Sequence, residues 1–317
     1  MNHILDFEKE LIEMENTLAE LTASSSKFGV DFQLNIQNLS KKCEERKREI
    51  YSHLTGWQTV QMARHPQRPI LQDLIPLIFS NFVEMHGDRL IGDDQAIIAG
   101  FARIADTGVM LIGNNKGKGV TDNLKRNFGM ASPEGYRKAL RLMKLAEKFG
   151  LPIVSLIDIP AAYPGKEAEA RGQAEAIGKN IYEMTQLQVP IICVVIGEGG
   201  SGGALAIGVG DIVLMLTHSI YSVAPPETCA TILWRDSKKA QEAANALKLR
   251  SNDLFELGII DEIVEEPSGG AHRDYQLTAD RIKTAILKHI QALQKMPIGA
   301  LVQKRFDKYS SMGVFNT

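Results

Sequence analysis

A run of glycines that directly follows an apolar stretch is the strongest constraint on how this chain can fold. Residues 189–210 read VPIICVVIGEGGSGGALAIGVG. The β-branched residues favour a buried strand, and the glycines allow a tight turn or the close approach of another molecule to the main chain. A small-residue helix after the turn would point its unpaired N–H groups back at the glycines. The sequence therefore predicts a strand, a glycine turn and a helix N-terminus that together can bind negative charge.

Three functional interpretations of this turn compete with a structural one, in which the glycines only permit a tight turn and close helix packing. In the first, Gly197, Gly199 and Gly202 form the G-x-G-x-x-G of a dinucleotide site. Such a site needs an acid at the end of the next strand to bind the ribose. The strand predicted at 211–219 has no acid at its far end, which argues against a dinucleotide.

In the second interpretation, residues 199–203 form a G-x-S-x-G motif around a nucleophilic Ser201. This mechanism needs an acid and then a histidine further along the chain. The available pairs are Asp211 with His218 and Asp261 with His272. Neither pair has independent support, so Ser201 is interpreted as a turn residue.

In the third interpretation, the backbone N–H groups around Gly202 and Gly203 polarise a thioester or ureido carbonyl group. They would then stabilise the oxyanion that develops on the carbonyl oxygen. The glycines alone do not decide between this function and the structural interpretation.

Charge and composition exclude several broad classes of protein. The 317 residues carry a net charge of −2, which predicts no binding to nucleic acid or to a membrane surface through bulk electrostatics. The N-terminal sequence has acidic residues where a signal peptide needs an apolar run, and no apolar segment is long enough to span a bilayer. The three cysteines lie far apart and form no metal-ligand or disulfide pattern. We therefore expect a cytoplasmic protein (or a stromal one in a plastid) without a metal site.

The pattern of apolar residues predicts a helical hairpin over residues 4–54. Apolar residues recur at alternating spacings of four and three, as in a coiled-coil seam, at Phe7, Leu11, Met14, Leu18 and Leu21. A break at 24–29 is followed by a highly charged second helix that carries Ile36, Leu39, Cys43, Ile50 and Leu54. Asp6 is predicted to be the N-cap of the first helix.

From about residue 70 the pattern changes to alternating strands and helices. Strands are predicted at 95–105, 109–114, 151–158, 189–197, 211–218 and 220–223, and helices at 133–149, 165–187 and 276–294. The segments FGLPIV and LQVPII occupy matching places before two strands, which favours a repeating β/α superhelix. The residues after 294 show no strong pattern. The sequence therefore predicts an N-terminal hairpin (1–55), an α/β domain (56–295) and a C-terminal tail (296–317).

Several separated segments resemble one known family. They are RNFGM with SPEGYRKALRLM (126–143), AYPG (162–165), RGQ with EAI (171–177), IGEGGSGGALAIGVGD (196–211) and GGAH (269–272), together with ARHPQRP (63–69) and GDR (87–89). In order and spacing they resemble the alpha subunit of the multisubunit acetyl-CoA carboxylase carboxyltransferase of bacteria and plastids. The resemblance extends from about residue 5 to residue 272.

The resemblance implies a crotonase-type (ClpP/crotonase-like) β/α superhelix. It also implies transfer of a carboxyl group from carboxybiotin, held on a biotin carboxyl carrier protein, to acetyl-CoA, which gives malonyl-CoA for fatty acid synthesis. The active site would lie between subunits in an assembly of two alpha and two beta chains, with biotin carboxylase in the wider complex. The alpha chain would supply the biotin side and bind no covalent cofactor. The beta chain would supply the acetyl-CoA side and a zinc ribbon, consistent with the lack of a Cys-x-x-Cys pair here.

Three groups of residues are candidates for the site. Gly202 and Gly203 would donate their backbone N–H groups to the ureido oxygen of biotin. Residues in two turns, together with Glu227 after a later strand, would contact biotin or substrate: Ala161, Ala162, Tyr163, Gly165, Gly199, Gly200, Ser201 and Glu227. A basic group could receive CoA phosphates or an acidic carrier surface, the alternative being a solvated helix face with intersubunit pairs: Lys116, Lys118, Arg126 and Arg137.

Three loops depart from the family pattern. Ala161 and Thr228 stand where the family usually has glycine, and 114–117 reads NNKG instead of a version with glutamine. Alanine in place of a glycine with positive φ costs about 1 kcal/mol and can shift a loop. Two alternatives therefore stay open. One is transfer to another acyl-CoA, chosen on the beta side, and the other is a catalytically weakened paralogue that scaffolds or regulates a carboxylase complex.

Overall fold

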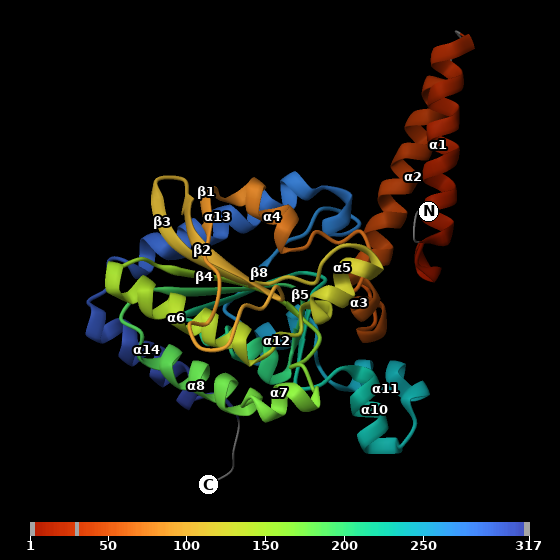
Figure 1. Ribbon diagram of the computed structural model, residues 1–317. Helices are drawn as coiled ribbons and strands as arrows, with labels where there is room; N and C mark the ends of the chain where they lie inside the picture. Colours follow the sequence, from red (N-terminus) through yellow and green to blue (C-terminus); the bar gives the residue numbers. More distant parts are fainter. Residues whose placement is uncertain (1–3, 29–31, 314–317) are drawn as a thin grey trace.

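The computed structural model describes residues 4–28 and 32–313. Within these ranges the chain folds around one mixed sheet in the order β1-β2-β3-β4-β5-β6-β8, with β7 paired to the end of β5 (Figure 1). The first three strands are antiparallel, and the strands from β3 to β8 run parallel. The strands are β1 (Ser80–Glu84), β2 (Ile97–Ile104), β3 (Thr107–Asn114), β4 (Ile153–Ile159), β5 (Ile191–Gly200), β6 (Ile212–Leu216), β7 (Ile220–Ser222) and β8 (Glu262–Val264).

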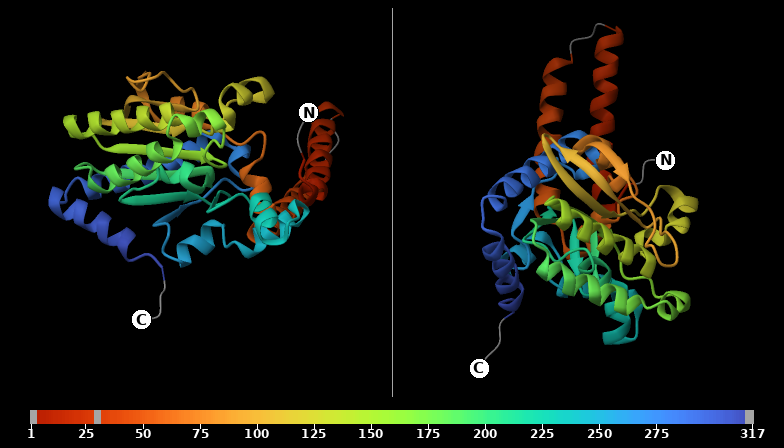
Figure 2. Two further views of the ribbon diagram at one scale, coloured as in Figure 1. Left: turned by 60° about the horizontal axis from the view of Figure 1, so that its bottom comes forward. Right: turned by 60° about the vertical axis from the view of Figure 1, so that its left-hand side comes forward.

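Helices cover both faces of this sheet, as the two views of Figure 2 show. They are α1 (Lys9–Phe28), α2 (Gln33–Ser52), α3 (Gly56–Ala63), α4 (Leu71–Ile78), α5 (Gly119–Lys125), α6 (Pro133–Phe149), α7 (Lys166–Ala170), α8 (Gln173–Gln186), α9 (Ser201–Leu205), α10 (Pro226–Trp234), α11 (Ala240–Ala246), α12 (Ser251–Glu256), α13 (Tyr275–Leu293) and α14 (Ile298–Ser310). Short 3-10 turns lie at Asp6–Glu8, Asn127–Gly129, Ser237–Lys239 and Ala271–Arg273. In the part of the chain that the structure describes, none of these helices has the length and apolarity needed to cross a bilayer.

The central strand β5 shows why its sequence is apolar without alternation. Ile191 and Cys193 join the core that β5 forms with α6 and α8 on one face, whereas Ile192 and Val194 join the core with α4 and α13 on the other. Successive side chains of a strand point to opposite faces. A parallel strand that is covered on both sides therefore needs apolar residues at every position.

Most of the predicted elements of the α/β part are confirmed within a few residues. The helix predicted at 133–149 matches α6, which ends where Gly150 adopts a left-handed φ of 65°. Strand β5 extends beyond its predicted end to Gly200, because its pairing with β4 and β7 continues through the glycines. The prediction of a single helix at 165–187 is wrong. The segment forms two helices, α7 and α8, which are separated at Gly172 with its φ of +83°.

The C-terminal residues, which show no strong sequence pattern, contain helix α14 and its buried Arg305. The Arg305 guanidinium forms a salt bridge with Asp211 at 2.8 Å. It also donates hydrogen bonds to the carbonyl oxygens of Met184, Leu187 and Val189. Only 1% of Arg305 is exposed. Helix α14 is thus attached to the end of α8 and to the start of β5 through one cation.

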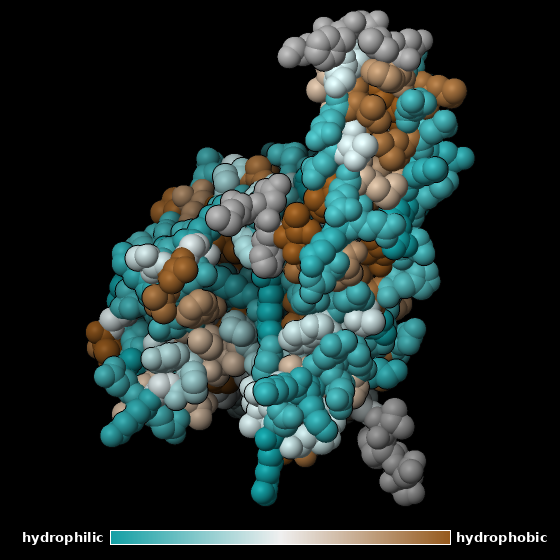
Figure 3. Space-filling view, turned by 90° about the vertical axis from the view of Figure 1, so that its right-hand side faces the viewer, coloured by the Kyte–Doolittle hydropathy of each residue, from teal (hydrophilic) through white to brown (hydrophobic). Residues whose placement is uncertain are grey.

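The predicted helical hairpin is present as α1 and α2, which project from the α/β body (Figure 1). Leu11 and Cys43 are buried between the two helices, and Figure 3 shows an apolar stripe along the hairpin bordered by hydrophilic residues. The hairpin is joined to the body near its base, where Arg273 pairs with Glu15 at 3.0 Å and Tyr51 lies beside His218.

Two details of the hairpin differ from the prediction. Asp6 is not the N-cap, because the first turn begins after Leu5 and Asp6 pairs with Lys9 instead. The N–H of Leu5 is bound by the side chain of Glu8 at 3.1 Å. The break predicted from residue 24 is also wrong, since α1 continues to Phe28. Gly29, the last residue of the predicted break, lies outside the described residues.

Candidate active site

The glycine turn lies at the carboxyl end of β5, in contact with the turn that follows β4. A Cβ atom on Gly200 would lie 1.8 Å from the carbonyl oxygen of Pro160, and one on Gly203 would lie 2.8 Å from the nitrogen of Ala162. Side chains do not approach backbone atoms this closely, so both positions require glycine. Close packing therefore explains why glycine stands at positions 200 and 203, and it leaves the role of the backbone N–H groups open.

The geometry at Ser201 and Gly202 is different. A Cβ atom on Gly202 would meet only Cγ2 of Ile177, at an ordinary 3.4 Å. Ser201 begins α9 with a φ of +52°, a left-handed conformation that turns the chain sharply from strand to helix. The N–H groups of Gly202 and Gly203 lie in the first turn of α9, where a helix supplies no acceptor of its own. These N–H groups are thus free to serve an acceptor outside the helix.

The structure does not support a nucleophilic Ser201. The side chains of all four candidate partners contact other residues: Asp211 binds Arg305, Asp261 binds Lys308, the His218 ring lies beside the Tyr51 ring, and His272 stacks on His65. These pairs therefore form no proton relay with Ser201.

The dinucleotide pattern also has a packing explanation. A Cβ atom on Gly197 would lie 2.3 Å from Oδ1 of Asp158, and one on Gly199 would lie 2.7 Å from the Tyr221 ring. Strand β6 is followed by Thr217 and His218, so no acid stands where a ribose would need one. The glycines at 197 and 199 thus admit neighbouring side chains rather than a pyrophosphate.

A group of charged side chains lies at the carboxyl ends of β3, β4 and β5, with Asp158 and Glu198 buried and the others partly exposed. We call it the strand-end cluster: Lys116, Asp158, Glu198, Arg64 and Glu227. The ammonium of Lys116 lies 2.6 Å from Asp158 and 2.9 Å from Glu198. The guanidinium of Arg64 lies 2.8 Å from a carboxylate oxygen of Glu198 and 2.6 Å from one of Glu227, so it connects the two carboxylates. The carboxyl ends of parallel strands are the usual place for ligands in α/β folds.

The cluster favours the charged forms of Glu198 and Lys116. Burial alone would raise the pKa of Glu198, but the charges of Lys116 and Arg64 lower that pKa below its ordinary value. Burial likewise opposes the charge of Lys116, yet Asp158 and Glu198 raise the pKa of its ammonium. Glu198 therefore stays a carboxylate next to the glycine turn.

Arg64 and Glu198 are site residues that were not predicted, although both stand in segments that carry the family resemblance. Glu198 is the only charged residue in the stretch 189–210, and a charge inside a predicted buried strand end was the available signal. Arg64 lies in ARHPQRP, more than 130 residues before its partner. Spacing along the chain gives no indication of such a contact.

The predicted basic residues are already paired within the chain. Lys116 points inward to the strand-end cluster, so the predicted contact of this lysine with CoA phosphates or a carrier surface is not supported. Lys118 pairs with Asp73 at 2.5 Å, and Arg126 pairs with Asp122 at 2.9 Å. Arg137 donates to the carbonyl oxygen of Arg171. These pairs lie within the chain, so the predicted contact of Lys118, Arg126 and Arg137 with CoA phosphates or a carrier surface, and its alternative of intersubunit pairs, both stay predictions.

The turn after β4 is built around Tyr163. A Cβ atom on Gly165 would lie 2.4 Å from the Tyr163 ring, so glycine allows the ring to fold over the backbone. The amide of Gln173 donates to the carbonyl oxygens of Ala131 and Tyr163. These contacts fix the turn that presents Ala161 and Ala162 to the glycine turn.

The two glycine losses cause no backbone strain. Among the described residues, neither Ala161 nor Thr228 has a positive φ, and Thr228 lies inside helix α10. Asn114, in the third departing loop, is buried and accepts the N–H of Asp158 at 3.3 Å. Backbone strain at Ala161 and Thr228 therefore gives no reason to expect a weakened site.

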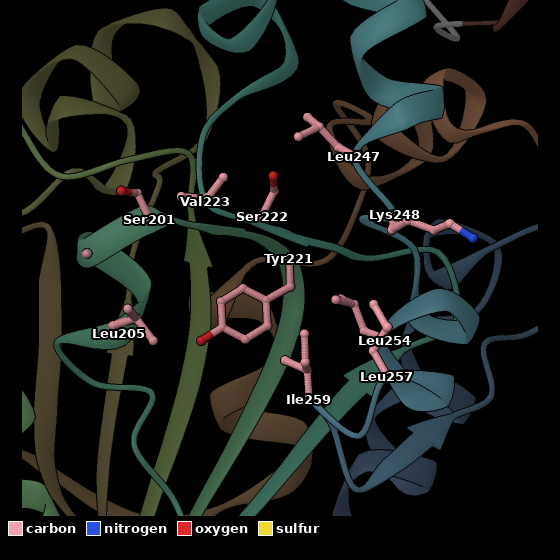
Figure 4. Close-up of a pocket in the computed structure, with 11 residues that line it drawn as sticks. Ser201, Leu205, Tyr221, Ser222, Val223, Leu247, Lys248, Leu254, Leu257 and Ile259 are labelled. Carbon is pink, nitrogen blue, oxygen red and sulfur yellow. The ribbon is translucent and has the colours of Figure 1, made fainter. Parts of the chain in front are cut away.

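An apolar pocket of about 390 Å³ adjoins the glycine turn (Figure 4). It is lined by Ser201, Gly202, Leu205, Tyr221, Ser222, Val223, Leu247, Lys248, Leu254, Leu257 and Ile259. Figure 4 shows the Tyr221 ring between Leu205 and Ile259, with Ser201 at the start of α9 above it. The first-turn N–H groups and an apolar surface are thus next to each other.

A second, buried network of ion pairs and hydrogen bonds joins segments that lie far apart in the sequence. Arg68 binds Glu266 at 2.6 Å and donates to the carbonyl oxygen of Ile196 at 2.7 Å. Glu266 also accepts the backbone N–H groups of His218 and Ala271, at 2.9 and 2.7 Å. Burial alone would raise the pKa of Glu266, but the charge of Arg68 and these bonds lower it to about 2.

We expect the Glu266 network to make stability fall in acid. A carboxyl group whose pKa is lowered by folding stabilises the protein above its unfolded pKa, and this stabilisation is lost as the pH falls from about 4.5 towards about 2. Glu266→Gln should remove part of this pH dependence and, by leaving Arg68 partly unpaired, cost about 3–5 kcal/mol at neutral pH. Both effects are measured by the free energy of unfolding in urea, determined at intervals of about one pH unit between pH 3 and neutral pH.

The matched control is Glu265→Gln at the exposed neighbouring position. It should change the neutral stability by less than about 0.5 kcal/mol. An equal acid dependence of the wild type and the Glu266→Gln variant would show that Glu266 is not responsible.

Comparison with solved structures identifies the class of fold. The structure of transcarboxylase 12S, with methylmalonyl-coenzyme A and methylmalonic acid bound, matches with a TM-score of 0.57 at 21% identity. The match covers 70% of this chain and 42% of that chain. The chain thus has the crotonase-type α/β fold of carboxyltransferases, as the resemblance implied.

Sequence comparison then identifies the family. A family model described as acetyl co-enzyme A carboxylase carboxyltransferase-like matches residues 4–313, and the chain belongs to this family. The acetyl-coenzyme A carboxylase carboxyl transferase subunit alpha of Methylococcus capsulatus is 52% identical over 315 residues, which cover 98% of this chain and 97% of that protein. The protein of the same name from Thermosynechococcus vestitus is 51% identical over 312 residues, 98% and 96% of the two chains.

Proposed function

We propose that this chain, together with a beta subunit, transfers the carboxyl group of carboxybiotin to acetyl-CoA and forms malonyl-CoA for fatty acid synthesis. The observation that carries the proposal is the identity of about half of all residues over nearly the full length of both chains. The glycine turn quoted for the resemblance is complete in this chain. Carboxybiotin would arrive on a carrier protein, and both it and acetyl-CoA would be substrates rather than resident cofactors.

The proposed catalytic groups are the backbone N–H groups of Gly202 and Gly203. Negative charge collects on the ureido oxygen when carboxybiotin gives up its carboxyl group, and fixed donors would stabilise it by roughly 3–4 kcal/mol each. The biotin nitrogen can then take a proton from the acetyl methyl group, so no protein side chain need act as base. Support comes from the position of these N–H groups in the first turn of α9, turned away from helical acceptors.

The apolar pocket beside Gly202 is the proposed seat of the biotin ring system. Its walls are mainly aliphatic and aromatic, through residues such as Leu205, Tyr221 and Ile259. A fused ring with one polar edge suits a site that has an apolar wall and donors at one end. The remaining candidates for substrate contact, in the turns at 161–165 and 199–201 and at Glu227, surround the same strand ends.

The proposed assembly is two alpha and two beta chains in the cytoplasm, with the carrier protein and biotin carboxylase as further partners. The beta chain would supply the acetyl-CoA side and a zinc ribbon. The hairpin (1–55) is proposed as a unit distinct from the α/β domain (56–295). The C-terminal tail (296–317) is proposed as a third segment. Within it, Arg305 of α14 binds Asp211 and the end of α8.

The test is the reverse reaction, the malonyl-CoA-dependent carboxylation of free biotin. It is measured with this chain alone, with this chain and a matching beta subunit, and with the beta subunit alone. Activity in the mixture only is the expected result, because each chain would supply half of the site. A stable complex that turns over neither malonyl-CoA nor methylmalonyl-CoA would refute the proposed function.

A further inference from the structure

We propose that Glu198 is a positioning residue, whose carboxylate fixes the direction of the N–H groups of Gly202 and Gly203. This inference rests on the proposed function, because it gives those N–H groups a catalytic role. Glu198 itself is 6% exposed and touches no reacting atom on this account. It acts by holding the backbone that carries the donors.

The first argument is the place of Glu198 in the chain. It belongs to β5 and lies four residues before Gly202, with only glycines and Ser201 between them. Glycines restrict the backbone least of all residues. The turn therefore needs an anchor outside the glycines, and Glu198 is the nearest side chain on the strand that could provide one.

The second argument is that Glu198 is held at three points. Its Oε1 accepts from Lys116 at 2.9 Å, and its Oε2 accepts from Arg64 at 2.8 Å. Its backbone N–H donates to Oδ1 of Asp158 at 2.9 Å. Three bonds in different directions leave the residue little freedom to rotate or to slide along the strand.

The third argument is that the same cluster holds the opposing turn. Asp158, near the end of β4, shares the ammonium of Lys116 with Glu198. The turn after β4 leads to Ala162, whose nitrogen packs against Gly203. Both sides of the donor region are thereby fixed to one cation. Supporting groups of this kind preserve the geometry of a site to a fraction of an ångström.

The stability that a buried ion pair adds to the fold does not explain why a carboxylate stands at this position. A buried ion pair adds little net stability, and apolar residues of similar volume often replace it without loss. Yet β5 carries an ionised residue at the point where it meets the glycine turn, while its earlier positions are apolar. A fixed, directional bond is what a carboxylate supplies and an apolar side chain does not.

The test variant is Glu198→Gln, studied in the complete complex with the beta subunit. The substitution keeps the size of the side chain, and it leaves Lys116 paired with Asp158 and Arg64 paired with Glu227. We expect kcat to fall by about 10- to 100-fold, because a displacement of about 1 Å has such effects on reacting geometry. The KM for malonyl-CoA should stay unchanged, since the CoA side belongs to the other subunit on this account.

Asp211→Asn is the matched control, at a residue that precedes β6 and lies beside the opposite end of β5. Asp211 is buried, pairs with Arg305 and accepts the N–H of Ile191, the first residue of β5. This variant should lower stability at least as much as Glu198→Gln does, with kcat within about two-fold of wild type at temperatures where both are folded. A kcat loss in Glu198→Gln no larger than in Asp211→Asn would overturn the positioning role.

Amide hydrogen exchange tests the proposal independently of activity. Glu198→Gln should speed exchange in the peptide that covers 199–206, and Asp211→Asn should speed it at the start of β5 instead. Unchanged exchange at 199–206 in the Glu198→Gln variant would refute the anchoring by Glu198. An inactive wild-type complex with the expected exchange pattern would refute the proposed function while leaving the anchor established.

Discussion

Replacement of Gly203 by valine is expected to reduce carboxyl transfer on the order of 10²- to 10³-fold, the loss seen when one oxyanion donor is removed. A Cβ atom at this position would lie 2.8 Å from the nitrogen of Ala162 and 2.9 Å from the carbonyl carbon of Ala161. Both obstacles are backbone, so the two turns must separate and the Gly203 N–H must move. The reverse reaction with the beta subunit measures the rate, and size-exclusion chromatography measures assembly, which should persist.

Alanine substitutions at adjacent positions separate this effect from a general effect of side chains on the turn. Gly203→Ala meets the same backbone atoms as valine does, whereas Gly202→Ala meets only Ile177 at 3.4 Å. We expect a large loss at Gly203 and a loss of less than about three-fold at Gly202, where the contact is an ordinary one. Full activity of Gly203→Val would exclude the proposed donors, and equal losses in both alanine variants would exclude the steric explanation.

Replacement of Arg305 by methionine is expected to destabilise the protein by about 3–5 kcal/mol, the usual effect of removing one partner of a buried ion pair. It would leave the Asp211 carboxylate without its cation and three carbonyl groups without a donor. Equilibrium unfolding in urea measures the change. Activity per folded molecule should be retained, because Arg305 lies at the amino end of β5, away from the glycine turn.

Lys304→Met is the control for this prediction, since it makes a similar change at an exposed neighbouring residue of α14. It should alter stability by less than about 0.5 kcal/mol. Equal unfolding midpoints for Arg305→Met and the wild type would show that the Arg305 interactions contribute nothing to the stability of the protein.

Local patterns predicted the elements of the α/β body well. Strand β5 and helix α6 were found because continuous apolar runs and a helical period of apolar residues are properties of neighbouring residues. The division of α7 from α8 was missed because a single glycine inside a helical pattern is usually tolerated. Gly172 breaks the helix because it adopts a positive φ, which only the folded backbone reveals.

The candidate site could be predicted only in part, for a different reason. The glycine turn is local and was recognised, but its anchors come from four other segments of the chain. Lys116 illustrates the difficulty. A lysine among glycines suggests a phosphate contact, yet Asp158 and Glu198 lie within 3 Å of its ammonium. Which carboxylates meet at the strand ends depends on the order of the strands in the sheet, and spacing along one sequence does not contain that order.

The position of Arg305 in the chain also affects how the protein is made. The carbonyl groups of Met184 and Val189 precede Arg305 by 121 and 116 residues. A ribosome that adds about 5–20 residues per second needs roughly 6–24 s to travel that distance. Until Arg305 is made, the nascent strand β5 has no guanidinium at its amino end. The Asp211 carboxylate, which precedes Arg305 by 94 residues, lacks this partner from its own synthesis onwards. The body of the molecule thus reaches its final packing only after α14 has been synthesised, and a chaperone that shields nascent strands has those seconds in which to act.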